Sequence, residues 1–283
     1  MTITTTYIDV EQSAPRIPAS RPITRTRRSD VASIPTALRG EWIKMRSIRS
    51  TPAILGLTVV VGVLLSWILA TFVKTDPDTH KVFTIGETFI FSTWLTTVLA
   101  VIMGTLMFTS EVQHGTLSTA VTAQPARWVT VSAKAMIATC FGLVMGIAGM
   151  IAGFGGAVVG GLDSGDTSGV AATALWGLLL TSLAPVFGLG VGMIIRHSSA
   201  AISTVLVYAL VLENLIRGFA APTLSRFLPF SAANGLLNIK SATDTPETAA
   251  VALSRVHDAL LFGGYTVGAI AIGTVLLYRR DTN

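Results

Sequence analysis

The residue types that carry out enzyme chemistry are few in this chain of 283 residues, and they are scattered. No HExxH or similar spacing places two of the four histidines (His80, His114, His197, His257) on one helical face. Cys140 is the only cysteine, which excludes an intrachain disulfide and a site of several cysteines. We therefore expect no metal site and no catalytic residue.

The sequence also lacks the motifs needed to bind a nucleotide phosphate or to move protons across a membrane. The chain has no Gly-Lys dipeptide, so a Walker-type phosphate loop is excluded. Its apolar segments lack the central charged residues that a proton-coupled carrier or an intramembrane protease needs. The sequence predicts a protein that is not an enzyme and that holds no cofactor of its own.

The composition is that of an integral membrane protein. Hydrophobic residues make up 51% of the chain and charged residues 12%, more apolar surface than one soluble core could bury. Spanning a bilayer takes a helix of about 20 apolar residues. Six segments meet this requirement and predict an all-α protein with six transmembrane helices, at about residues 52–73, 89–109, 135–162, 170–195, 200–221 and 259–278.

The fifth of these segments is the least regular. Its uninterrupted apolar part ends at Leu212, and Glu213, Asn214 and Arg217 follow before Pro222. The sequence leaves open whether the fifth helix is broken there.

Lysine and arginine concentrate on one side of the predicted membrane. With the N-terminus inside, fourteen of the twenty fall on the cytoplasmic face, nine of them before the first span. The positive-inside rule then predicts that both termini lie in the cytoplasm. We expect the protein in the plasma membrane. The net charge of +5 reflects this bias and an attraction to anionic lipids, and we expect no nucleic-acid partner.

The N-terminal part divides into a tail and a helix. Residues 1–35 contain several prolines among Ser, Thr and Arg, which predicts a disordered cytoplasmic tail. Residues 36–50 predict an amphipathic helix at the membrane interface. Apolar residues recur at helical spacing: Leu38, Trp42, Met45 and Ile48. The basic residues lie elsewhere around the helix: Arg39, Lys44 and Arg46. The alternative is a basic flank that only fixes orientation. Residues 51–283 form the six-helix domain.

A polar stretch joins the second and third spans and must lie at one membrane face. It contains Glu111, Gly115, Thr116, Leu117, Pro125, Arg127 and Lys134. Glu111 could begin a short helix, favoured by the positive N-terminal end of the helix dipole. Arg127 and Lys134 could face acidic groups or phosphates of a partner. The alternative is that these charges only mark the membrane boundary.

Glycines form a stripe along the third span. They advance by steps of four and three and therefore share one helical face: Gly142, Gly146, Gly149, Gly153, Gly156 and Gly160. Such a face lets another helix approach closely. The two interpretations are packing within the bundle and a helix that slides during transport.

The segment from Arg217 to His257, on the external side, is too long for a simple turn. It contains the apolar groups Leu228-Pro229-Phe230 and Gly235-Leu236-Leu237, which we expect to dip back toward the membrane. Glu213 and Arg217 are four residues apart and could pair near the outer interface. That pair could be structural, or it could act in gating or substrate contact.

Together these features resemble an ABC-2 type ABC transporter permease, with a type V exporter-like fold. The resemblance rests on the six spans, the basic helix of residues 40–47, the loop residues from Glu111 to Lys134, and the ending Tyr278-Arg279-Arg280-Asp281. It covers about residues 36–283.

The resemblance implies an exporter in which two permeases, identical or paralogous, form the pathway and two separate cytoplasmic ATPases bind ATP and Mg. The loop of residues 111–134 resembles the coupling helix that docks on the ATPase. Residues 36–50, with Glu41, Trp42, Lys44 and Arg46, resemble the connecting helix beside it. The region of Glu213, Arg217 and Pro229 resembles the external cap and is a possible outer gate.

The substrate class expected is a hydrophobic or amphipathic compound such as a drug, a lipid or a peptide. Two other classes of protein remain as alternatives. A secondary carrier would need coupling-ion groups within the bilayer, and a membrane scaffold or immunity protein would make ATP irrelevant.

Overall fold

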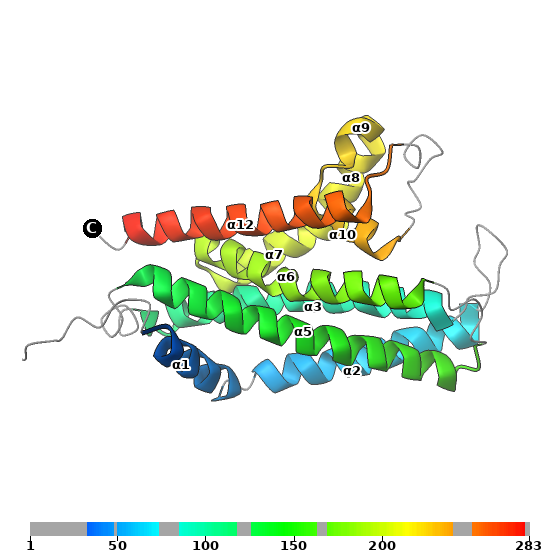
Figure 1. Cartoon of the computed structure of the whole chain (residues 1–283), viewed down its shortest axis with the longest axis horizontal. Coiled ribbons are helices and arrows are strands. Elements are labelled where there is room, and N and C mark those ends of the chain that lie inside the picture. The colour runs from blue at the N-terminus through cyan, green and yellow to red at the C-terminus, as the bar shows by residue number, and fades with distance from the viewer. Residues whose placement is uncertain are drawn as a thin grey trace, which may run out of the picture.

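The computed structural model describes residues 33–47, 50–73, 85–117, 126–162, 169–239 and 251–280, and every regular element in these ranges is a helix (Figure 1). The elements are α1 (Ile34–Ser47), α2 (Ser50–Ile68) with the π-helical turn η3 (Leu69–Val73), α3 (Ile85–Gln113), α5 (Arg127–Val159), α6 (Val170–Ile195), α7 (Ser198–Val207) with η4 (Tyr208–Leu212) and α8 (Glu213–Phe219), α9 (Pro222–Ser225), α10 (Pro229–Leu237) and α12 (Arg255–Arg280). Only the last few residues of the predicted tail, residues 1–35, are among the described residues. Helix α1 begins there, at Ile34.

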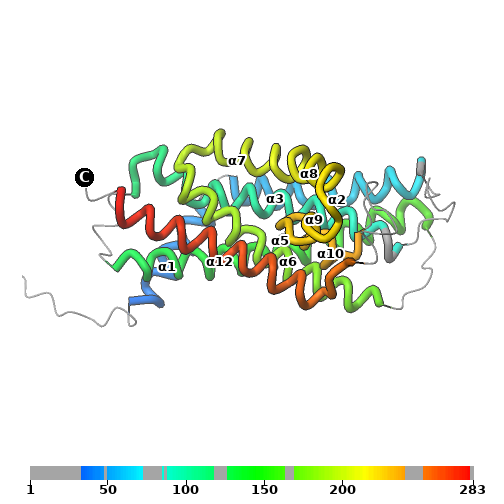
Figure 2. Tube along the Cα trace, turned by 90° about the horizontal axis from the view of Figure 1, so that it is seen from above, coloured from blue at the N-terminus to red at the C-terminus, as the bar shows by residue number. Residues whose placement is uncertain are grey.

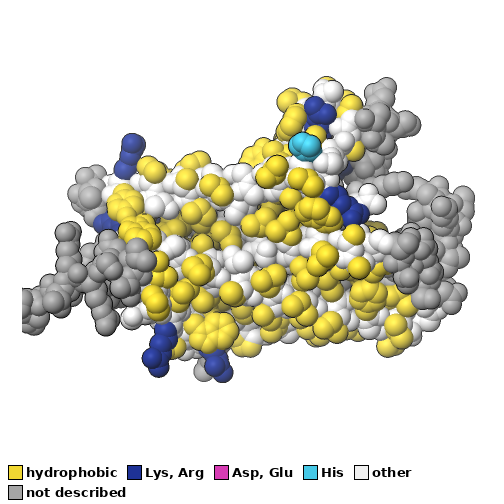
Figure 3. Space-filling model, viewed as in Figure 1, with side chains coloured by type: hydrophobic (Ala, Val, Ile, Leu, Met, Phe, Trp, Pro, Cys, Tyr) yellow, Lys and Arg dark blue, Asp and Glu magenta, His cyan; other side chains and the backbone are white. Residues whose placement is uncertain are grey.

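The prediction of an all-α membrane protein is confirmed. Six helices of the described chain are long and apolar enough to cross a membrane: Ser50–Phe72, Thr88–Gln113, Arg127–Val159, Val170–Ile195, Ser198–Phe219 and Arg255–Arg280. Figure 3 shows apolar side chains along the length of the bundle, with Lys and Arg gathered toward its ends.

The long helices run side by side in one bundle (Figures 1 and 2). Helix α5 packs against α2, α3 and α6, while α12 lies along α6, and α7 contacts α3 and α6. Helix α1 and the last turn of α12 lie at one end of the bundle, and α8, α9 and α10 lie at the other (Figure 1). We call these the α1 end and the α10 end.

Helix α5 begins eight residues before the apolar run that predicted it. Its 33 residues extend for about 50 Å, well beyond a hydrocarbon core of about 30 Å. The early start places Arg127 and Lys134 inside the helix, at the α1 end. Hydropathy could not locate this boundary, because the charge of Lys134 is neutralised by carboxylates from other helices.

The glycine stripe of α5 contacts three different helices within the chain. A Cβ at Gly142 or Gly146 would meet Thr181 of α6, and one at Gly156 would meet Val63 of α2. Between them, Gly149 and Gly153 face Thr96 and Ser92 of α3, and Gly160 faces Ala70 of η3. One stripe can meet three partners because those helices cross α5 at successive heights. This arrangement supports the interpretation of packing within the bundle.

Hydroxyl groups line helix α3 on the sides that meet α5 and α6. The Oγ1 atoms of Thr93, Thr97 and Thr105 each donate to the carbonyl oxygen four residues earlier, at 2.8, 2.9 and 2.9 Å. Two hydroxyls also cross between helices: Ser92 Oγ lies 3.1 Å from Gly149 O, and Thr105 Oγ1 lies 3.2 Å from Gly188 O. These α3 side chains thus pack closely while their hydroxyls stay hydrogen-bonded in an apolar environment.

The fifth span is continuous but irregular. It runs as α7, η4 and α8 without a gap, and the π-helical turn η4 ends at Leu212, where the apolar run ends. The span therefore bulges rather than breaks. The side-chain amide of Asn214 donates to the carbonyl oxygen of Leu210, which lies in the π-helical turn, at 2.9 Å.

The segment after the fifth span folds back onto the bundle, as expected. Pro229 begins α10 at its first turn, where its missing N–H costs nothing. Leu236 and Leu237 are buried against α6 and α12, in a cluster that includes Leu180 and Phe262 of those two helices. Phe230, also buried, belongs to the larger core cluster of the bundle.

The glycine contacts predict unequal effects of one added methyl group. Gly142→Ala should lower the free energy of unfolding by about 1–3 kcal/mol, because its Cβ would overlap the Thr181 carbonyl oxygen and the Pro185 ring. Gly155→Ala, on the same helix, should leave stability unchanged or slightly raised, since no atom lies within 4 Å of its Cβ. Thermal unfolding in detergent measures both, and equal transition temperatures would contradict the packing described.

Candidate functional site: an ion network and an exposed turn at the α1 end

Four charged side chains from three helices meet at the α1 end. The Nζ atom of Lys134, in α5, lies 2.7 Å from Oε2 of Glu41 in α1 and 2.6 Å from Oε1 of Glu111 in α3. The Nζ atom of Lys44 lies 3.0 Å from Oε1 of each of the same two glutamates. Two lysines and two glutamates therefore form a closed network with no net charge, which we call the ion network.

The members of the network differ in exposure. The side chains of Lys134, Glu41 and Glu111 are only 3, 8 and 9% exposed, whereas that of Lys44 is 43% exposed. Burial alone would lower the pKa of Lys44, but Glu41 and Glu111 outweigh it, so this pKa lies above its ordinary value of 10.5. Lys44 therefore carries its charge at neutral pH. Lys134 is the buried centre, and Lys44 covers the network from outside.

Glu111 sits at the opposite end of a helix from the one expected. It lies in the last turn of α3 and does not begin a new helix. A carboxylate there faces the negative end of the helix dipole, a cost of about 0.3–1 kcal/mol that the two lysines offset. Its Oε2 atom is buried and has no hydrogen-bond partner among the described residues.

Gly115 lies four residues after Glu111, just beyond the last residue of α3. Its φ of 68° is left-handed, its N–H donates to Val112 O at 3.2 Å, and the N–H of Thr116 donates to Glu111 O at 3.0 Å. These two bonds form a Schellman motif, in which glycine takes the left-handed position without steric strain. Residues 113–116 are exposed, while Leu117 packs against the core. The sequence identified this turn but not its function as a helix stop.

Two residues predicted to face a partner, Arg127 and Lys134, have contacts inside the chain. Lys134 is buried, so its charge is not available to a partner, and that expectation is wrong for this residue. Arg127 donates to Leu277 O of α12 at 2.7 Å and lies 5.3 Å from the Tyr278 ring centre. Pro125 lies outside the described residues.

The C-terminal ending also has contacts within the bundle. Arg280 donates to Ile194 O, in the last turn of α6, at 3.0 Å. Arg127 likewise donates to Leu277 O, in the last turn of α12. An arginine therefore lies at the C-terminal end of α6 and of α12, where the helix dipole favours a positive charge. The ends of α6 and α12 and the start of α5 are thereby joined beside the ion network.

The spacing of apolar residues predicted only part of the α1 face that packs against the bundle. Met45 is buried and Leu38 packs against the core, as expected, but Trp42 is 46% exposed. Glu41 takes its place on the inner face. The spacing of Leu38, Glu41 and Met45, at i, i+3 and i+7, could have indicated this face. Arg46 is exposed.

Comparison with known proteins gives a family for this arrangement. A family model described as ABC-2 family transporter protein matches residues 37–219, which contain most of α1, the ion network and the first five spans. The chain belongs to the ABC-2 transporter family. No curated protein matches the chain in sequence.

Family membership establishes the broad function. This ABC-2 protein is a multi-pass membrane permease component of an ABC transporter, a transport component that is not itself catalytic. Association with an ABC ATPase follows from the family. Among the described residues, no group of three or more His, Cys, Asp or Glu side chains could hold a metal ion.

The ABC-2 permease has a second polar group at the α10 end. The carboxylate of Glu213, only 2% exposed, accepts from the backbone N–H groups of Phe230, at 3.0 Å, and Ser231. These are among the unpaired donors of the first turn of α10, which Pro229 begins. Glu213 therefore ties the fifth span to α10, and the outer gate assigned to Glu213, Arg217 and Pro229 stays a prediction.

The two lysines of the network predict different losses of stability in the ABC-2 permease. Lys134→Met should cost about 3–5 kcal/mol, because it leaves two buried carboxylates with a single half-exposed cation. Lys44→Met should cost about 1 kcal/mol at most, since solvent screens its charge. Adding Glu111→Gln to Lys134→Met should recover part of the loss. Thermal unfolding in detergent gives the order, and equal losses for the two lysines would argue against a buried centre.

Proposed function

We propose that this permease is half of the membrane pathway of an ATP-driven exporter and that a separate cytoplasmic ATPase binds at the α1 end. One observation carries the proposal: the exposed turn at residues 113–116 directly follows the buried ion network. Through that network the turn is tied to α1 and α5 as well as to α3.

A partner that pushes on the turn would move three helices together. Glu111 lies two residues before the exposed part, and its carboxylate is held by lysines of α1 and α5. Breaking such a buried pair by moving one member alone would cost several kcal/mol. Movement of the three helices as a unit avoids that cost, so the network favours coupled motion.

The distribution of basic residues supports a cytoplasmic position for the α1 end. Eight described Lys and Arg residues lie there: Arg39, Lys44, Arg46, Arg127, Lys134, Arg196, Arg279 and Arg280. The α10 end has Arg217, Arg226 and Arg255 among the described residues. This bias supports, by the positive-inside rule, the proposal that both termini lie in the cytoplasm. The membrane proposed is the plasma membrane.

The proposed mechanism is alternating access driven from outside the chain. ATP and Mg bind to the ATPase subunits, whose closure brings together the α1 ends of two permeases, identical or paralogous. Arg127 joins α5 to α12, so the last span would follow the same displacement. The proposed cargo is a hydrophobic or amphipathic compound, because the spans offer it mostly apolar surface.

The exposed turn provides the test. His114→Trp should reduce copurification of the ATPase encoded beside this permease at least tenfold, because a bulky side chain on an exposed docking turn prevents close contact. Leu224→Trp, at a residue that is also exposed but lies at the α10 end, should leave copurification unchanged. Both are measured by pull-down from lipid nanodiscs, with ATP hydrolysis as the second readout.

Two results would count against the proposal. If His114→Trp and Leu224→Trp bind the ATPase equally well, docking does not use this turn. If no ATPase copurifies with the wild-type permease and export proceeds without ATP, the chain is not driven in the way proposed.

A further inference from the structure

Helix α1 exposes a face that combines positive charge with large apolar side chains. Arg39, Trp42, Ile43 and Arg46 are spaced at i, i+3, i+4 and i+7, which places them on one side of the helix, away from the buried Glu41. Trp42 and Ile43 are 46 and 55% exposed, and both arginines are exposed. We call these four residues the α1 outer face. Figure 3, drawn from the same side as Figure 1, shows Lys and Arg side chains beside apolar ones where α1 lies.

The fold leaves the positive charge of this face uncompensated. Among the described residues, the only acidic side chains at the α1 end are Glu41 and Glu111, and both are buried in the ion network. Neither arginine of the α1 outer face forms an ion pair with a described residue. In the sequence Glu41 would offset one of its basic neighbours, but in the fold it points inward. The exposed surface of α1 is therefore more basic than its composition.

Exposed aromatic residues mark the depth of this face in the membrane. Trp42 in α1, Trp128 in the first turn of α5 and Tyr278 in the last turn of α12 are all exposed at the α1 end. Trp and Tyr gather where the hydrocarbon of a bilayer meets its headgroups, because one part of each side chain is apolar and the other polar. These three residues place the α1 outer face at the level of the phospholipid headgroups.

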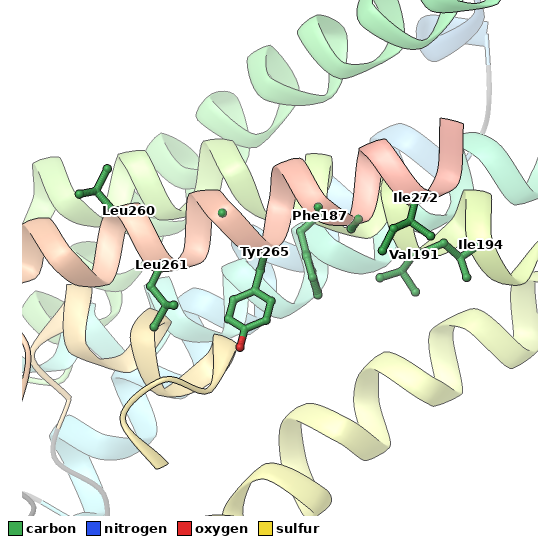
Figure 4. A pocket seen from close by; sticks show the side chains of 10 residues that line it. Phe187, Val191, Ile194, Leu260, Leu261, Tyr265 and Ile272 are labelled. Atoms are coloured by element: carbon green, nitrogen blue, oxygen red, sulfur yellow. The ribbon is translucent and has the colours of Figure 1, made fainter. Parts of the chain in front are cut away.

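Exposed apolar surface alone would not distinguish this face. The groove between α6 and α12, with a volume of about 510 Å³, is also apolar, and the residues that line it carry no charge (Figure 4). Its hydroxyl, that of Tyr265, donates to Phe227 O at 2.9 Å. The groove offers a lipid only what any hydrocarbon surface offers, whereas the α1 outer face adds two guanidinium groups.

We propose that the α1 outer face binds anionic phospholipids in the leaflet at the α1 end, which the proposed orientation makes the cytoplasmic one. Arg39 and Arg46 pair with lipid phosphates, which match the planar guanidinium group. Trp42 and Ile43 lie between the two arginines and enter the boundary between headgroups and acyl chains. Phospholipid bearing a net negative charge matches both properties of the face. Lipid bound there would hold α1, and with it the ion network, at the membrane surface.

Photolabelling of the full chain tests the proposal. The permease is reconstituted without ATPase or nucleotide in phosphatidylcholine nanodiscs that contain a trace of photoreactive lipid, with a diazirine next to the headgroup. The probe is phosphatidylglycerol, its control is phosphatidylcholine, and mass spectrometry locates the labelled segments. The phosphatidylglycerol probe should label α1 about fivefold more than the control, the factor expected for one basic residue near an anionic surface. Raising the salt from about 0.05 M to about 0.5 M should remove most of this preference by screening.

Two paired variants separate charge from folding. Arg39→Gln with Arg46→Gln should label equally with both probes. Its thermal transition in detergent should equal that of the wild type, because both side chains are exposed and neither forms an ion pair with a described residue. Arg39→Lys with Arg46→Lys keeps both charges and should retain most of the preference for phosphatidylglycerol.

Either of two outcomes overturns the proposal: equal labelling of α1 by both probes in the wild type, or a preference that survives in the glutamine pair. If the glutamine pair lowers copurification of the ATPase while the lipid preference is unchanged, the α1 outer face binds protein and the proposal is wrong. The labelling assay contains no ATPase, so its failure would leave the docking at residues 113–116 untouched.

Discussion

Inside a hydrocarbon layer a charged or hydrogen-bonding group has no water to bind, so leaving it unpaired is costly. Among the described residues a few buried atoms, such as Ser66 Oγ and Glu111 Oε2, have no partner, but other such groups find a partner in the protein. The helix α3 hydroxyls do so by donating to carbonyl oxygens of their own helix and of α5 and α6. Glu213 does so at the start of α10, and Lys134 does so between two glutamates. The same constraint determines where helices touch, because each satisfied group fixes a contact between two elements.

Close packing is the second requirement, and glycine meets it together with serine and threonine. In lipid, apolar side chains gain little by leaving one apolar surface for another, so helices associate through backbone approach and hydrogen bonds. Helix α5 supplies the glycines, and α3 and α6 supply hydroxyls at the same heights. The charged contacts of the described residues lie toward the ends of this interlocked centre, among them the ion network, Arg127 and Arg280 at the α1 end and Glu213 at the α10 end.

Hydropathy alone predicted the six spans, because the bilayer imposes one length and one polarity on every crossing helix. The glycine stripe was also visible, since a 3.6-residue period needs no knowledge of partners. The ion network was not predicted, because it joins Glu41 to Lys134 across 93 positions and no local pattern encodes such a pair. For the same reason Glu111 was placed at the wrong end of a helix: its stabilising lysines belong to other elements.

Helix α5 runs through the whole bundle without a proline or a π-turn, unlike α6, which contains Pro185, and the fifth span, which contains η4. It is therefore a stiff rod with its charged end in the ion network and its other end against Ala70. At a length of about 50 Å, a tilt of about ten degrees about its midpoint would displace each end by about 4 Å, in opposite directions. A lever of this kind reverses the direction of a push, so a force that draws the α1 end inward would spread the opposite end.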